Sequence, residues 1–407
     1  MDRNSRRSFI RSLFSGSLIA SLAGKDLFSL GDDKNDLASN ASMRYRRLGR
    51  TNLLISEISL GGSPLPDWAI LLQAIEKGVN YIDTSNTYMN GNSERQIGNL
   101  FKEIGRDTVH VGTKFHLRDP WNKESIVESV NSSLRRLQTD YVDVLLIHGA
   151  SNPDDLTDEI VLSAFDDLKK EGKFRFRGLS CHTNHAEIVK QAVRCGLYDM
   201  IQVGYNVFDI QDTEEKVKTY DDYLGASGIR EILRLAKSQD VGIIAMKVLK
   251  VGGRRQDLEK YKTYTASLYQ SMLKWALENQ CISSVVIEML TFQQLEEDLA
   301  AVGQPLTEEE KKALFVYVAK NSRDYCHMCG ICEKHCPSGI ETSSILRYLA
   351  YLQEYQKSSR AKQAYSQLHP GRTFLVCQDC GQCETHCPYG VSVRERIKEA
   401  HVLLSSP

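Results

Sequence analysis

The sequence predicts a (β/α)8 barrel followed by a small, mainly helical domain. Between residues 44 and 303, short apolar runs rich in β-branched residues alternate eight times with amphipathic helical stretches. Eight such units match the size of a (β/α)8 barrel. A doubly wound open sheet is the alternative, but it usually has a glycine-rich phosphate loop after its first strand, and here only Gly61 and Gly62 stand there. Beyond residue 303 the pattern changes, and eight of the 11 cysteines follow residue 325.

The composition is that of a soluble globular protein. Hydrophobic residues make up 42% and charged residues 25% of the 407 residues, which gives room for one large and one small domain. A formal net charge of −1 argues against a nucleic-acid partner.

The first 23 residues resemble a twin-arginine export signal. Arg6 and Arg7 precede Phe9 in the expected pattern, and a short, weakly apolar stretch follows at residues 13–23. This stretch is too short to span a membrane. We therefore predict a signal peptide at residues 1–23, a disordered linker at 24–43, recognition by the twin-arginine export machinery and a periplasmic or extracytoplasmic location. A disordered basic tail is the alternative.

The predicted elements of the barrel alternate in a regular order. The strands are the β-branched runs at 57–62, 81–85, 109–115, 142–148, 177–182, 200–206, 241–248 and 282–288. The helices are the amphipathic stretches at 67–77, 93–104, 123–137, 160–171, 185–195, 229–239, 266–279 and 291–301. Ser93, Thr183 and Thr291 stand where helix N-caps are expected.

Polar residues stand at the carboxyl ends of six consecutive strands. In a (β/α)8 barrel these ends meet at one face, where active sites lie. Buried polar groups are costly unless they are paired, so their recurrence at this end indicates a functional site. The residues are Asp83, Lys114, His148, Ser180 with His182, Gln202 with Asn206, and Lys247.

These residues resemble the aldo-keto reductase superfamily over residues 44–303. Asp83 and Tyr88 form its Asp-x4-Tyr segment, a signature-like stretch from Gly91 to Gly98 follows, and Lys114 and His148 complete a tetrad at family-like intervals. The resemblance implies that Tyr88 donates a proton to the alkoxide formed when a carbonyl accepts hydride. We expect Lys114 to bring the pKa of Tyr88 closer to neutrality, Asp83 to hold Lys114, and His148 to orient the carbonyl.

The same resemblance implies a nicotinamide site. At two positions of this site the sequence differs from the familiar members of the superfamily. Ser180 and Gln202 lie in the nicotinamide-contacting segments, and Met246, beside Lys247, stands where familiar members stack a tyrosine on the ring. Glu288 would repel a 2′-phosphate, while Arg254 and Arg255 offer either a substitute anion site or a solvated loop. The predicted cofactor is therefore NADP(H) or NAD(H), and a flavin is not excluded.

Two cysteine runs with the spacing C-x2-C-x2-C-x3-C-P end the chain. This is the bacterial ferredoxin spacing, in which the fourth cysteine binds the other cluster. The predicted ligands are therefore Cys326, Cys329, Cys332 and Cys387 for one 4Fe–4S cluster, and Cys377, Cys380, Cys383 and Cys336 for the second. Structural zinc is the alternative, although it has no use for the additional cysteines.

Residues 304–407 resemble the α-helical ferredoxins, and the whole chain resembles a ferredoxin-bearing subset of the superfamily. Tyr348, Tyr351 and Tyr355 lie near helical spacing, which indicates a packing role. We predict an exported oxidoreductase that interconverts a carbonyl and an alcohol on a small substrate, with a sugar-like polyol as one candidate. Its electrons would pass through two 4Fe–4S clusters to a redox partner protein or a membrane electron carrier. The alternative is an electron-transfer subunit whose barrel binds a ligand or partner without turnover.

Overall fold

The computed structural model describes residues 43–117, 121–208, 228–249, 258, 261–264, 266–353 and 358–406. The predicted signal peptide, nearly all of the predicted linker, Arg254, Arg255 and Tyr355 lie outside these residues.

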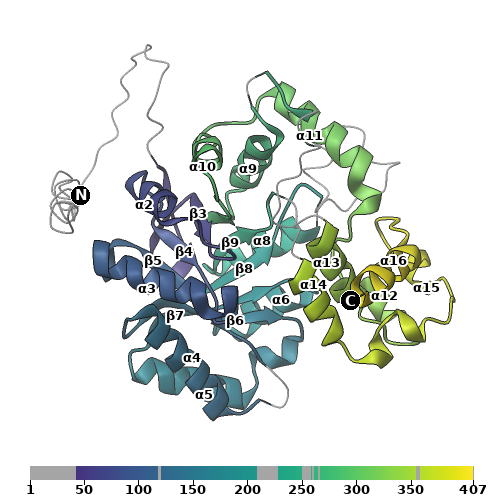
Figure 1. Ribbon diagram of the computed structural model, residues 1–407, viewed down its shortest axis with the longest axis horizontal. Coiled ribbons are helices and arrows are strands. Elements are labelled where there is room, and N and C mark those ends of the chain that lie inside the picture. Colours follow the sequence, from purple (N-terminus) through teal and green to yellow (C-terminus); the bar gives the residue numbers. More distant parts are fainter. Residues whose placement is uncertain are drawn as a thin grey trace.

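Eight parallel strands close into a barrel, with helices around it (Figure 1), so the predicted fold class is confirmed. The strands pair in chain order, and the last strand closes the ring against the first. Every predicted strand is present, and the ends differ by three residues at most. The barrel strands are β3 (Ile58–Gly61), β4 (Tyr81–Asp83), β5 (His110–Phe115), β6 (Val142–Ala150), β7 (Phe174–Cys181), β8 (Met200–Gly204), β9 (Gly242–Met246) and β10 (Ser284–Ile287).

The helices of the barrel follow the predicted amphipathic stretches. Thr291 caps its helix by accepting the Gln294 N–H at 3.1 Å, as predicted. The other two predicted caps are wrong, because α3 and α6 begin after Gly91 and Asn184. The helices are α2 (Trp68–Glu76), α3 (Asn92–Ile104), α4 (Lys123–Leu137), α5 (Glu159–Lys170), α6 (His185–Cys195), α8 (Gly228–Ser238), α9 (Leu268–Glu278) and α10 (Phe292–Leu299).

A hairpin closes the end of the barrel where the strands begin. It consists of β1 (Tyr45–Arg47) and β2 (Leu54–Ser56), which pair antiparallel. Leu48, Leu53 and Ile55 form one buried cluster with residues that point into the barrel. The amino-terminal end is thus plugged by side chains, and the polar residues of the sequence analysis lie at the other end.

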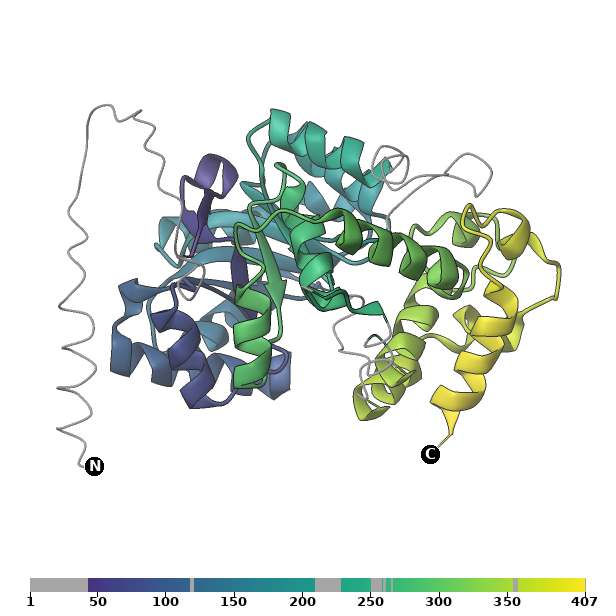
Figure 2. The ribbon, with the colours of Figure 1, turned by 90° about the horizontal axis from the view of Figure 1, so that it is seen from above.

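The C-terminal part of the chain packs against the end of the barrel where the strands finish. Helix α11 (Glu308–Asn321) is held on the barrel by a buried ion pair of 2.6 Å between Lys274 and Glu310. A second buried core joins the helices that follow, which Figures 1 and 2 show gathered at one side of the barrel. These helices are α12 (Ile331–Lys334), α13 (Thr342–Gln353), α14 (Ser358–Ser366), α15 (Gln382–Thr385) and α16 (Val393–Ser405).

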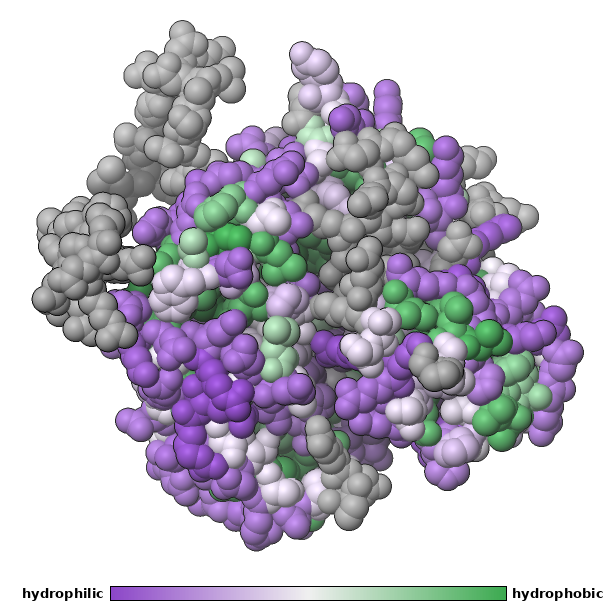
Figure 3. Space-filling model, viewed as in Figure 1, coloured by the Kyte–Doolittle hydropathy of each residue, from purple (hydrophilic) through white to green (hydrophobic). Residues whose placement is uncertain are grey.

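The outer faces of the barrel helices are polar. Figure 3 shows a largely hydrophilic surface over the region of α3, α4 and α5, as expected for helices that bury one apolar stripe against a sheet. Within the described residues, none of the helices has the length and apolar character that crossing a membrane requires.

A buried carboxylate ties three strands together near the amino-terminal end of the barrel. Asp143 of β6 accepts from Arg106 at 2.7 Å, from Arg175 at 2.8 Å and from the Val111 N–H at 2.9 Å. Burial opposes its ionisation, but His110 and Arg106 outweigh burial, so the pKa of Asp143 is lowered. Because the folded pKa is depressed, this stabilisation is present above about pH 4, the ordinary carboxyl value, and is lost as the pH falls.

We expect Asp143→Asn to lower the free energy of unfolding by about 3 kcal/mol, because it removes the buried carboxylate that pairs with Arg106 and Arg175 and accepts the Val111 N–H. Glu296→Gln, which breaks the exposed pair with Lys77, is the matched control and should cost no more than about 1 kcal/mol. Anaerobic chemical denaturation measures both. Equal losses in the two variants would contradict this account of Asp143.

Candidate active site and cluster-binding domain

A buried ion pair joins the ends of β4 and β5. The Lys114 ammonium donates to Asp83 Oδ1 at 2.5 Å and to the Thr84 carbonyl at 2.7 Å. Burial raises the pKa of Asp83 and lowers that of Lys114, and the charge of each partner offsets the effect of burial on the other. Both side chains are almost wholly inaccessible to solvent, so this pair forms the floor of the site.

The stretch that follows Tyr88 supports this floor. Glu94 of α3 is fully buried, accepts from the Thr113 hydroxyl at 2.6 Å and pairs with Arg136 at 2.6 Å. The hydroxyl of Ser93 lies 2.7 Å from that of Thr84, which explains why Ser93 does not cap the helix. The signature-like segment therefore positions the residues on either side of the ion pair.

Tyr88 lies at the start of a short 3-10 helix after β4. Its hydroxyl is 3.5 Å from Lys114 Nζ, and its ring edge meets the His148 ring with centroids 5.6 Å apart. We expected Lys114 to bring the pKa of Tyr88 towards neutrality, but the structure shows the opposite direction. Burial first, and then the negative charge of Asp83, raise the pKa of Tyr88 well above its ordinary value. Tyr88 is therefore a protonated donor throughout the neutral range.

His148 is held as a neutral imidazole. Its Nδ1 lies 2.9 Å from the Ser85 hydroxyl, and its ring stacks on His116 at 4.0 Å. Burial, and then the charges of His116 and Lys114, lower the pKa of His148 well below its usual value. A neutral imidazole at this place can hydrogen-bond to a carbonyl oxygen without adding a charge.

The four residues predicted to contact a nicotinamide lie at the ends of neighbouring strands. The Gln202 amide bonds to Asp83, and its Oε1 atom is buried without a partner among the described residues. Ser180 accepts the Gly149 N–H at 3.0 Å. Met246 ends β9 and is 8% exposed, and Lys247 follows it with its amine buried. The unpartnered Gln202 oxygen fits a ligand amide, as a nicotinamide would provide.

Several residues of this site were not predicted from the sequence. Ser85 and His116, the partners of His148, lie two residues after Asp83 and Lys114, at or just beyond the ends of the predicted strands, so their place at the same end of the barrel could have been recognised. Arg360, whose guanidinium carbon lies 6.0 Å from the Tyr88 ring centroid, comes from α14. No signal in the sequence connects a helix so far along the chain to the barrel.

The eight cysteines of the two runs line two separate cavities. Cysteine thiolates are the ligands of 4Fe–4S clusters, and four of them lining each cavity fit one cluster. One cavity contains Cys326, Cys329, Cys332 and Cys387, and the other contains Cys336, Cys377, Cys380 and Cys383. The fourth cysteine of each run thus lies with the first three of the other run, which is the crossed grouping expected from the spacing.

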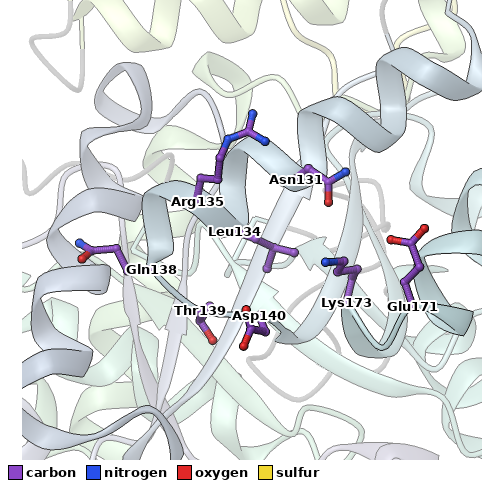
Figure 4. Close-up of a pocket in the computed structure, with 8 residues that line it drawn as sticks. All are labelled: Asn131, Leu134, Arg135, Gln138, Thr139, Asp140, Glu171 and Lys173. Atoms are coloured by element: carbon purple, nitrogen blue, oxygen red, sulfur yellow. The ribbon is translucent and has the colours of Figure 1, made fainter.

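Another pocket of about 500 Å³ lies away from both sites. Figure 4 shows that it is lined from the end of α4 by Arg135 and Gln138 and, across from them, by Glu171 and Lys173 before β7. This is the end of the barrel where the strands begin. Because (β/α)8 barrel chemistry takes place at the opposite end, we assign it no part in the reaction.

Comparisons with known proteins agree with both parts of this description. Residues 67–315 match the aldo/keto reductase family, and residues 322–391 match the 4Fe-4S dicluster domain. An uncharacterized oxidoreductase of Bacillus subtilis, YqkF, is 29% identical over 300 residues, which cover 67% of this chain and 95% of that protein. L-galactose dehydrogenase of Arabidopsis thaliana is 28% identical over 64% of this chain and 89% of its own length.

Solved structures show the same barrel. An aldo-keto reductase from Klebsiella pneumoniae in complex with NADPH superimposes with a TM-score of 0.53 at 22% identity, over 68% of this chain and 95% of that one. The matched family model covers more than half of the present sequence, and the tetrad lies at the end of the barrel where the family's chemistry takes place. This chain is therefore an oxidoreductase of the aldo/keto reductase family, with a 4Fe-4S dicluster domain after its barrel.

Proposed function

We propose that this protein is an exported oxidoreductase that interconverts a carbonyl and an alcohol on a small substrate, with two 4Fe–4S clusters as its route for electrons. The observation that carries the proposal is the position of Lys114, whose ammonium lies between Asp83 and the hydroxyl of Tyr88 beside the neutral His148.

In the reducing direction each member of the tetrad has one task. His148 hydrogen-bonds to the carbonyl oxygen and orients it. Tyr88, kept protonated by its surroundings, donates its proton to the oxygen as the alkoxide forms. Lys114 supplies positive charge next to the phenolate that remains, and Asp83 keeps that ammonium in position.

A nicotinamide would supply or accept the hydride. The strand ends at Ser180, Gln202, Met246 and Lys247 are the surfaces that would hold it, and the unpartnered Gln202 oxygen supports this assignment. NADP(H) and NAD(H) both remain candidates, since Glu288 disfavours a 2′-phosphate. The substrate class is supported by the name of one relative, L-galactose dehydrogenase, which denotes activity on a sugar.

Two 4Fe–4S clusters would supply one-electron transfer in the C-terminal domain. The two sets of four cysteines support this part of the proposal. A redox partner protein or a membrane electron carrier would exchange electrons with this domain.

Export is proposed from the residues around Arg6 and Arg7. The twin-arginine route moves folded proteins, as a chain that receives clusters before crossing the membrane requires. A free nicotinamide pool is not expected outside the cytoplasm. The cofactor would therefore travel tightly bound and be recycled through the clusters, or the barrel would run as a dehydrogenase towards an external acceptor.

A second candidate function is an electron-transfer subunit whose barrel binds a ligand or partner without turnover. Two differences from familiar family members favour it. Met246 stands where those members have a tyrosine stacked on the nicotinamide, and Glu288 stands where they have groups that favour the adenosine phosphate.

Tyr88→Phe separates the two candidates. The substitution keeps the ring and removes the proton donor, so we expect kcat to fall by about 100-fold or more while ligand affinity stays nearly unchanged. Lys114→Met should act in the same way, and Tyr264→Phe, at a ring that is 98% exposed, is the control. Turnover is followed by nicotinamide absorbance and by cluster reduction. If both tetrad variants pass electrons through the clusters between a physiological donor and acceptor at the wild-type rate, the binding module is favoured.

Paired cysteine variants test the crossed grouping. Wild-type protein should contain about eight iron atoms per chain. If Cys326 and Cys387 bind the same cluster, the double variant Cys326→Ser/Cys387→Ser keeps about half of this iron, while Cys336→Ser/Cys387→Ser loses nearly all of it. Iron analysis and electron paramagnetic resonance of anaerobically prepared protein distinguish these results, with Cys195→Ser as the control. Loss of nearly all iron from Cys326→Ser/Cys387→Ser as well would show that each run binds its own cluster.

Replacing Arg6 and Arg7 together by lysine tests export. We expect a cluster-containing precursor to accumulate in the cytoplasm, because the export machinery reads the arginine pair itself. Cell fractionation followed by immunoblotting measures the distribution, and Arg3→Lys is the matched control. Unchanged export of the double variant would remove the twin-arginine assignment.

A further inference from the structure

Lys247 extends from the carboxyl end of β9 over that of β8. Met246 pairs with Gly204 of β8, and Val203 pairs with Cys181 of β7, so Lys247 starts one residue beyond the level of His182. Its side chain crosses over β8, since Lys247 Cδ lies 3.9 Å from the place that a Cβ on Gly204 would occupy. The amine itself is buried and has no hydrogen-bond partner among the described residues.

Two arginines from the dicluster domain approach the same region. Arg360 of α14 donates to the Ser63 hydroxyl at 2.9 Å, and its guanidinium carbon lies 6.0 Å from the Tyr88 ring centroid and 5.4 Å from that of Tyr351. Arg347 of α13 donates to the Tyr348 hydroxyl at 3.4 Å, while its buried Nε has no partner in the described part of the chain.

These cations lie within electrostatic reach of one another and of the tetrad. Burial first, and then the positive charges of Arg347 and Arg360, lower the pKa of Lys247 to about 8, while Tyr351 and Cys181 oppose them. The charge of Arg347 also lowers the pKa of His182 and of His148. The charges of Lys247, Arg347 and Arg360 therefore all act on the group of rings formed by Tyr88, His148 and His182.

Lys247 Nζ and Arg347 Nε are buried donors without an acceptor in the described part of the chain. Asp83 is already bonded to Lys114, and Glu341 is a carboxylate that acts on Arg347 from the dicluster domain. Leaving buried charged donors without an acceptor is costly. An anionic ligand would remove this cost.

We propose that Lys247, Arg347 and Arg360 bind the oxyanion of the substrate, so that the substrate is a small carbonyl or hydroxyl compound carrying a carboxylate or phosphate. This inference rests on the proposed function and narrows its substrate class. Arg360 lies over Tyr88, and the field of Arg347 reaches His148, which are the residues that face the reacting oxygen. For this reason we assign the oxyanion to the substrate rather than to the pyrophosphate of the cofactor.

Both arginines lie beyond residue 315, where the aldo/keto reductase match ends. The dicluster domain would therefore complete the substrate site of the barrel as well as carry the clusters. A barrel without that domain would lack two of the three cations.

Matched ligand pairs test this assignment on the full chain with its clusters. Each pair differs by one charged group: gluconate with glucitol, glycolate with ethylene glycol, and glycerol 3-phosphate with glycerol. Isothermal titration under anaerobic conditions gives the affinities. In at least one pair, we expect the anion to bind about tenfold or more tightly than its neutral partner, the usual value of a charge-assisted contact.

Arg347→Gln and Arg360→Gln should each remove most of this preference without changing the affinity for the neutral partner. Arg135→Gln removes the same charge at the far end of the barrel and should leave the preference intact. Two variants are used because Arg347 is partly buried and Arg360 is exposed, so a folding defect in one does not decide the outcome.

Three results would overturn the assignment: no preference for the anion in any pair, a preference that survives in both arginine variants, or an equal loss of NADP⁺ affinity in those variants. The last would assign the oxyanion to the cofactor. Because binding is measured without turnover, failure here is independent of the Tyr88→Phe result on which the proposed function depends.

Discussion

The buried ion pair between Asp83 and Lys114 is the constraint on which the rest of the site depends. An ammonium group inside a barrel is costly unless a carboxylate and a further acceptor compensate for its lost hydration. Asp83 and the Thr84 carbonyl meet this requirement because the last residues of β4 and β5 lie side by side. The orientation of the Lys114 side chain then fixes the position of its ammonium group, with Nζ 3.5 Å from the Tyr88 hydroxyl. Burial, and then the negative charge of Asp83, raise the pKa of Tyr88, which explains why Tyr88 keeps its proton.

The dicluster domain is joined to the active end of the barrel by side chains as well as by the covalent chain. The Asn206 amide donates to the Tyr325 hydroxyl at 2.9 Å, and the Asn184 N–H donates to the Met328 carbonyl at 3.3 Å. Arg360 bonds to Ser63, which follows β3. These contacts come from loops after three different barrel strands. The placement makes the barrel mouth and the domain that holds the cysteine cavities one structural unit, so a substrate beside Tyr88 would meet residues of both.

Much of this architecture could be predicted because its signals are local. Alternating apolar strands and amphipathic helices specify a barrel, and a polar residue inside a Val, Ile or Leu run, such as Lys114, stands out. The cysteine spacing likewise predicts which thiols share a cavity, since a run that ends in Cys-Pro turns its last cysteine away. Helix starts were harder, because Ser93 forms a buried bond with Thr84 that no local pattern reveals.

Features that depend on tertiary contacts could not be predicted. The approach of Arg347 and Arg360 to the tetrad results from how two domains pack, and sequence spacing contains no information about it. The predicted direction of the pKa shift of Tyr88 was wrong for a related reason. Sequence spacing places Lys114 near Tyr88, but only the structure shows that burial and then the charge of Asp83 raise the pKa of Tyr88.

The central claim is that the tetrad performs hydride chemistry on a bound nicotinamide in a chain that also holds two clusters. The most direct measurement is the cofactor content of the full chain, purified anaerobically from its own compartment and then denatured. The account predicts about eight iron atoms and a similar amount of sulfide, together with nicotinamide that is released on denaturation or binds saturably when added. A chain that contains the iron but neither releases nor binds a nicotinamide would contradict it.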